Sequence, residues 1–198
     1  MKFTHLHVHS HYSILDGMSK VPDLVDKCLR TGMNSIALTD HGNMYGIKEL
    51  LDYCKKINKK NKEAWAEKHP DEPFVPFKPI VGVEAYCARR GRLMKDKDHK
   101  SVSGEGRQFV TDMSGWHLIL LAKNKAGYHT LCKLVSEGFM DDAFYRTPRI
   151  DKELLEQVGF KDVLCINPPD MTLETAMRPE VARRNVFETV KEYLSTLP

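Results

Sequence analysis

Long hydrophobic runs, paired cysteines and a strong net charge are all missing from this sequence, and each absence excludes a class of protein. No apolar stretch approaches the roughly 20 residues that a membrane-spanning helix needs. The opening residues, MKFTHLHVHS, lack the apolar core of a signal peptide. The five cysteines are scattered without a C-x-x-C pair, which argues against a disulfide framework. We therefore expect a cytoplasmic protein in a reducing compartment, with no membrane partner.

The remaining composition describes an ordinary folded domain. Hydrophobic residues make up 41% of the chain and charged residues 29%, which is typical of a soluble globular protein. A net charge of +3 is too weak to indicate nucleic-acid binding by itself. The 198 residues are enough for one domain, and we find no internal repeat.

Segments typical of strands and helices alternate along the chain. The expected strands cover residues 3–9, 35–39, 80–86, 117–122 and 162–166. The expected helices cover residues 20–30 (with Ser19 as N-cap and Gly32 after the last turn), 45–58, 126–139, 151–157 and 179–197.

Two polar stretches interrupt this alternation, and we interpret both as surface insertions: residues 59–78 and 89–114. The alternation favours an α/β fold with parallel strands. Polar residues at the strand ends favour a barrel over an open sheet. An eightfold barrel needs roughly 200–250 residues, so the five expected strands leave this barrel incomplete.

Histidines are concentrated at the start of the chain, at His5, His7, His9 and His11. Alternate residues of a strand share a face, so His7 and His9 can bind one metal ion together. A polar strand with histidines facing water is the simpler interpretation of this pair taken alone.

Further candidate ligands follow at the later strands. His41, in the run TDHG, follows a buried strand directly, where parallel α/β folds place functional groups. Glu84 lies inside the apolar strand IVGVEAY, where a charge is costly unless it is paired or bound to metal. His117 begins the run HLILLA, and Asp16 lies in the turn LDG after the first strand. A histidine or carboxylate therefore stands at four successive strand ends.

This ligand set indicates a chemistry. Mixed imidazole and carboxylate ligands suit Zn²⁺, Mn²⁺ or Fe²⁺ better than Ca²⁺ or Mg²⁺. A carboxylate such as Glu84 can bridge two ions, and two ions about 3.5–4 Å apart supply hydroxide and neutralise charge on phosphorus. The pattern predicts hydrolysis of phosphate esters.

The chain also resembles a known family. The runs HLHVHSHYSILDGMSK, ALTDHGNMYGIKE, FKPIVGVEAY, WHLILLAKNKAGYHTLCKLVS and RTPRID are similar, in order and spacing, to the PHP domain of bacterial DNA polymerase III alpha subunits. The resemblance covers residues 1–157, apart from the two insertions. It implies a distorted, TIM-like (β/α)7 barrel that binds two to three divalent ions, with the glutamate bridging. The ligands that it implies are His7, His9, Asp16, His41, Glu84 and His117.

In that family the PHP domain provides 3′–5′ exonuclease proofreading in some members and is a structural remnant in others. The resemblance implies a DNA 3′ end as substrate and the rest of the polymerase, or other replisome proteins, as partners. The parent enzyme is a DNA-directed DNA polymerase, but this chain lacks the segments that polymerise DNA. His5 and His11 match no ligand position.

The family pattern fades after residue 157. Pro169 stands about where family members have a cysteine ligand, and Cys165 or Asp170 would have to substitute for it. We therefore interpret residues 158–198 as a divergent strand and a C-terminal helix. The metal site would lack ligands and bind ions more weakly. The chain would be a truncated or recombined fragment, or a domain completed by another chain.

Two other functions stay open at this point. A stand-alone PHP phosphatase for small molecules would share the H-x-H and D-H elements, although such enzymes do not usually share the runs YSILDG and TDHGNM. A non-catalytic remnant would bind only metal or a partner. Two basic segments could contact nucleic acid, although a solvated surface is the simpler interpretation. They contain Arg89, Arg90 and Arg92 in the second insertion, and a lysine cluster from Lys55 to Lys62.

Overall fold

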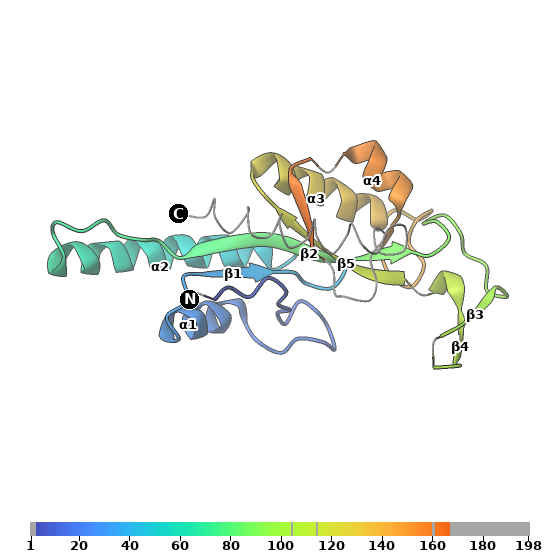
Figure 1. Cartoon of the computed structure of the whole chain (residues 1–198), viewed down its shortest axis with the longest axis horizontal. Helices are drawn as coiled ribbons and strands as arrows, with labels where there is room; N and C mark the ends of the chain where they lie inside the picture. The colour runs from blue at the N-terminus through green and yellow to red at the C-terminus, as the bar shows by residue number, and fades with distance from the viewer. Residues whose placement is uncertain (1–2, 104, 114, 160, 167–198) are drawn as a thin grey trace.

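One five-stranded sheet organises the computed structural model, which describes residues 3–103, 105–113, 115–159 and 161–166 (Figure 1). The strand order is β1-β2-β5-β7, and the short strand β6 pairs with the end of β2. The strands are β1 (Ser35–Leu38), β2 (Lys78–Ala88), β5 (Gly115–Ala122), β6 (Arg149–Ile150) and β7 (Val163–Ile166).

The sheet is mixed, so the prediction of parallel strands is only partly confirmed. β1 and β6 run parallel to β2, whereas β5 runs antiparallel to both β2 and β7. A parallel return needs a crossover connection, usually a helix. The segment between β2 and β5 instead contains a small hairpin, β3 (Lys100–Val102) with β4 (Gln108–Val110), and the short 3-10 helix η1 (Thr111–Met113). β5 therefore returns beside β2 in the opposite direction.

The described α-helices are α1 (Val21–Arg30), α2 (Ile47–Lys68), α3 (Lys125–Gly138) and α4 (Lys152–Val158). Three were expected almost where they lie, but α2 continues ten residues beyond its predicted end at 58. The first half of the expected insertion 59–78 is therefore helical. The expected cap of α1 is wrong as well, because Lys20 holds the N-cap position without a side-chain hydrogen bond. Gly32 has the left-handed φ of +77° expected after this helix.

The helices cover one face of the sheet. Val83, Ala85 and Cys87 of β2 face the core beneath α3, where they pack with Leu131 and Leu134. Alternate residues of a strand point to opposite faces, so Gly82, Glu84 and Tyr86 belong to the other face. The register of β2 with β5 places His117 opposite Tyr86 on that same face. Glu84 and His117 therefore lie away from the helices.

The N-terminal segment is not the regular strand expected over residues 3–9. It forms a single parallel bridge, between His5 and Ile36, and runs beside β1 as extended chain. Two backbone bonds hold it there, from Ala37 N to His5 O and from Thr39 N to Val8 O, each 2.9 Å. The segment still delivers its histidines to the end of β1.

The strands form an open sheet in the part of the chain that the structure describes, which agrees with the expected shortage of strands for a barrel. The expected helix over 179–197, Pro169 and Asp170 lie outside the described residues. Among the described helices, none has the length and apolar character to cross a bilayer.

Candidate metal centre

The six candidate ligands come from five separate stretches and meet at one end of the sheet. His7 and His9 lie in the N-terminal segment, Asp16 in the following loop, and His41 directly after β1. A bridge between His41 and Glu84 continues the pairing of β1 with β2, and Gly42 N donates to Glu84 O at 2.7 Å. This backbone pairing fixes the loop after β1 against the middle of β2.

The Glu84 carboxylate is the hub of the cluster. Its Oε2 atom lies 2.5 Å from His9 Nε2, 3.3 Å from His7 Nε2 and 3.9 Å from His41 Nε2. Its Oε1 atom lies 2.9 Å from His117 Nδ1. The Glu84 side chain is 4% exposed, whereas those of His7 and His117 are 45% and 43% exposed. The carboxylate is therefore buried at the floor of a site that is open on the histidine side.

Two atoms in this cluster have no hydrogen-bond partner although they are buried: Glu84 Oε2 and His41 Nε2. Buried polar atoms are nearly always paired, so unpaired ones need an explanation. A buried carboxylate oxygen and a buried imidazole nitrogen that lack hydrogen-bond partners are donor atoms that a divalent metal ion can use.

The donor atoms form three overlapping groups, in each of which they lie within 4.8 Å of one another. The groups are His7–His9–Glu84, His9–Asp16–His41 and His41–Glu84–His117. All six residues expected from the sequence are therefore brought together. The cluster suits divalent metal ions.

The cluster holds its acid as a carboxylate. Burial raises the pKa of the Glu84 carboxyl, but the imidazoles of His117, His7 and His9 outweigh burial and leave that pKa below its ordinary value. The close contact of its ring with the Glu84 carboxylate is the main cause of a raised pKa for His9. Glu84 is thus available as an anionic ligand at neutral pH.

A second layer of buried polar residues fixes the loops that carry the histidines. Asp40 accepts hydrogen bonds from Ser10 N at 2.7 Å and from Ser13 Oγ at 2.8 Å. Ser13 Oγ in turn accepts from His41 N at 2.9 Å. Sequence reasoning missed this network, although an aspartate directly after a buried strand and two serines in HSHYS were the available signals.

Tyr86 forms one wall of the site. Its ring stacks on His41, with centroids 4.5 Å apart and an angle of 15° between the ring planes. Gly42 makes this possible, because a Cβ atom there would lie 2.9 Å from Tyr86 Cε2, and its φ of +68° favours glycine. The stacking fixes the plane of the His41 ring.

Asp16 reaches the site from a loop whose apolar side chains are exposed to solvent. Its Oδ2 atom lies 2.5 Å from His41 Nδ1, and this contact is the main reason that the pKa of Asp16 is lowered. The preceding residue, Leu15, has a left-handed φ of 75° and a fully exposed side chain. Ile14 and Met18 are also exposed, so the loop holds its aspartate inward and its apolar side chains outward.

The other candidates from the sequence lie outside these groups. His5 and His11 are exposed, and His11 packs on the ring of Tyr12. The three arginines expected to contact nucleic acid make contacts within the chain, and their binding of nucleic acid stays a prediction. Arg89 lies over the rings of Phe109 and Trp116, Arg90 pairs with Asp112, and Arg92 pairs with Asp151.

A family model for the PHP domain matches residues 5–196. The chain belongs to the PHP domain family. The resemblance expected from the motifs is confirmed, and the match extends past residue 157. The boundary predicted there stays a prediction.

Relatives of this PHP domain include curated proteins named DNA polymerase III subunit alpha. The one from Borreliella burgdorferi is 40% identical over 190 residues, which is 96% of this chain and 14% of that protein. The one from Chlamydia pneumoniae is 37% identical over 167 residues, which is 84% of this chain and 11% of that protein. The chain thus spans about a seventh or less of the length of these relatives.

Two solved structures give weaker likenesses. A metal-dependent phosphoesterase from Bifidobacterium adolescentis has a TM-score of 0.37 and 14% identity, over 68% of this chain and 32% of that one. An amidohydrolase from Chromobacterium violaceum has a TM-score of 0.38 and 16% identity over the same shares. Likenesses this low add nothing to the assignment.

Proposed function

We propose that this PHP domain is the N-terminal portion of a DNA polymerase III alpha subunit, and that its metal centre hydrolyses the phosphodiester at a DNA 3′ end. The relatives named above support the first part. The second part rests on Glu84 Oε2, a buried oxygen without a hydrogen-bond partner, which has three imidazole nitrogens within 4 Å. The partners would be DNA, the rest of the polymerase and other replisome proteins, in the cytoplasm.

The tautomers of the histidines limit how many ions this cluster can hold. A neutral imidazole has one nitrogen that binds metal and one that carries a proton. His9 and His41 each belong to two of the three groups, so each can serve only one of them. Two groups share no histidine: His7–His9–Glu84 and His41–Glu84–His117. Each of these two groups would hold one ion, and Glu84 would be a ligand common to both.

Asp16 then acts on His41 instead of binding an ion. With His41 Nε2 directed at Glu84, its Nδ1 carries the proton and donates to Asp16 Oδ2. A carboxylate that accepts the second N–H of a metal-binding histidine fixes the tautomer and raises its basicity. A third ion, in the group His9–Asp16–His41, would require one of these histidines to change its nitrogen.

The ions and the protein side chains would have different roles in hydrolysis. The histidines and carboxylates suit Zn²⁺, Mn²⁺ or Fe²⁺, and two such ions, when bound, would supply a hydroxide nucleophile and neutralise charge on phosphorus. His7 and His117, the exposed ligands, border the side from which a phosphodiester enters. Tyr86 and Asp16 hold His41 in one orientation from its ring face and its Nδ1 atom.

The test is metal content together with hydrolysis of 3′-labelled single-stranded DNA by the purified chain. We expect about two ions per chain, and loss of hydrolysis on chelation and in His9→Ala. His11→Ala is the matched control, because His11 lies two residues away and outside the metal groups. Less than one ion per chain, or equal activity in the two variants, would refute the proposal. Hydrolysis of a sugar phosphate but not of DNA would favour the stand-alone phosphatase.

A further inference from the structure

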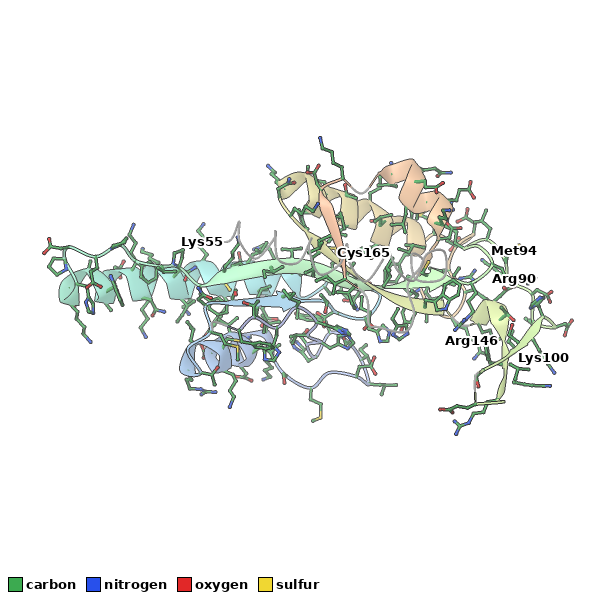
Figure 2. The ribbon with its side chains drawn as sticks, in the orientation of Figure 1. Lys55, Arg90, Met94, Lys100, Arg146 and Cys165 are labelled. Atoms are coloured by element: carbon green, nitrogen blue, oxygen red, sulfur yellow. The ribbon has the colours of Figure 1, made fainter. Side chains whose placement is uncertain are left out.

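Five lysines lie on one side of α2 between residues 55 and 62. Figure 1 shows that the C-terminal part of this helix extends beyond the sheet. We call the five lysines the lysine face: Lys55, Lys56, Lys59, Lys60 and Lys62. All five are exposed, and Figure 2 labels Lys55 at its start. At 3.6 residues per turn they cover an arc of about 160°, with Lys55, Lys59 and Lys62 within about 60° of one another.

The opposite side of the helix is held by contacts with the loop that follows it. Asn58 exchanges two hydrogen bonds of 2.8 Å with the backbone of Phe77, and Trp65 Nε1 donates to Glu72 O. The Trp65 ring also stacks on His69, with centroids 4.1 Å apart. The loop after α2 therefore folds back along the helix and fixes the side away from the lysines.

The lysines of this face have no ion pairs within the described residues, although the exposed Glu63 lies among them on the same arc. Lys48 on the preceding turns, by contrast, pairs with Asp52. Like charges four residues apart, as in Lys55–Lys59 and Lys56–Lys60, repel one another and destabilise a helix slightly. The helix thus retains a repulsion that a bound polyanion would remove.

The spacing of these charges fits a nucleic-acid backbone. Residues 55 to 62 extend about 10 Å along the helix axis, at 1.5 Å per residue. Double-stranded DNA carries one negative charge per ~1.7 Å of its axis, or about six over that length. We propose that the lysine face binds the phosphate backbone of duplex DNA without sequence preference. This site is separate from the metal centre and does not require the centre to be active.

An anionic membrane is the weaker candidate. A helix that binds at a membrane surface presents an apolar face beside its basic one. The apolar side of α2 is already used: Ile57 and Trp65 are partly buried, and the loop covers that side. Binding to DNA needs only the ammonium groups, which are the part of the helix left free.

The experiment measures binding of a short labelled DNA duplex of mixed sequence over a series of salt concentrations, in the presence of a chelator. Chelation stops metal-dependent hydrolysis, so the result is independent of the proposed enzyme activity. The variant is K55Q/K59Q/K62Q. The matched control is K27Q/K125Q/K133Q, which removes three exposed lysines from α1 and α3. Circular dichroism checks that both fold.

We expect the lysine-face variant to reduce the slope of log K against log salt by about 2–3, since each phosphate contact contributes about 0.9. The control should change it by less than about 1, and a second duplex of unrelated sequence should bind equally. Equal effects of the two variants would overturn the proposal. The proposal would also be overturned if the chain bound phosphatidylglycerol vesicles or polyglutamate through these lysines and did not bind DNA.

Discussion

Among the described residues, two of the clusters that contain buried charges differ in how completely their atoms are paired. One is the metal centre around Glu84. The other, which we call the arginine clamp, fixes the segment between β2 and β5 against β6. It consists of Arg149, Asp112 and Asp151, with Arg90 and Arg92.

The buried charged groups of the arginine clamp have hydrogen-bond partners within the chain. The buried Arg149 guanidinium donates to the backbone carbonyls of Ala143, Met94 and Asp112 at 2.9–3.0 Å, and also to that of Arg92. Asp112 accepts from the Arg90 side chain and from Asp96 N. No side-chain atom of the clamp is among the unpaired buried atoms of the described residues.

The metal centre leaves Glu84 Oε2 and His41 Nε2 unpaired, and that difference separates a structural cluster from a binding one. Burying a charge is costly unless hydrogen bonds and ion pairs compensate it. The clamp supplies this compensation from the chain, whereas the centre requires something that the chain does not supply. Both clusters contain buried charged groups, so burial alone does not distinguish them.

The largest effect that this comparison predicts belongs to the clamp. Arg149→Leu leaves the four backbone carbonyls named above without their guanidinium donor, so we expect a loss of about 3–5 kcal/mol in the free energy of unfolding. Urea unfolding measures it. Arg146→Leu, an exposed change nearby, should cost less than about 0.5 kcal/mol. Metal content per folded chain should stay the same, and a selective loss of metal in Arg149→Leu would erase the distinction between the clusters.

The next effect belongs to the metal centre. Glu84→Ala removes the ligand shared by both proposed ions, so we expect metal affinity to fall by more than about 100-fold. Asp16→Ala removes a group that orients His41, and such changes typically cost about 10–100-fold. Metal titration of the two purified variants compares these losses directly. Equal losses would contradict the bridging role of Glu84.

The sequence could predict the cluster of histidines and carboxylates around Glu84 because these residue types rarely stand where they do. Glu84 interrupts an apolar strand, and His41 follows a buried one, so each was conspicuous without any knowledge of the fold. The arginine clamp was not predictable in this way. Arg149 lies in a strand of two residues, too short for a pattern, and its partners are mostly backbone carbonyls, which every residue has.

The errors in the fold have similar local causes. The strand direction of β5 depends on its connection, and the insertion before it showed no periodicity from which to predict a hairpin. α2 was ended too early because apolar periodicity stops near Ile57, yet the lysines, alanines and glutamates that follow favour a helix by intrinsic propensity. The expected N-terminal strand has the right alternation of side chains, but only His5 pairs with β1 as a strand residue.

Ser13 provides the finest test, because it joins a satisfied network to the unsatisfied centre. Its hydroxyl donates to Asp40 Oδ1 and accepts from His41 N. Ser13→Ala leaves that N–H and one lone pair of Asp40 without partners, so we expect unfolding to become easier by about 1–3 kcal/mol. Metal affinity should fall by less than in Asp16→Ala, because Asp16 still holds the His41 ring.

Ser19→Ala is the control for Ser13→Ala, because Ser19 is exposed and does not cap α1. It should change neither quantity appreciably. A Ser13→Ala variant that keeps its stability but loses its metal would place the serine among the ion-binding groups. Ser13, although its hydroxyl is fully hydrogen-bonded, would then belong to the metal centre and not to the network that supports it.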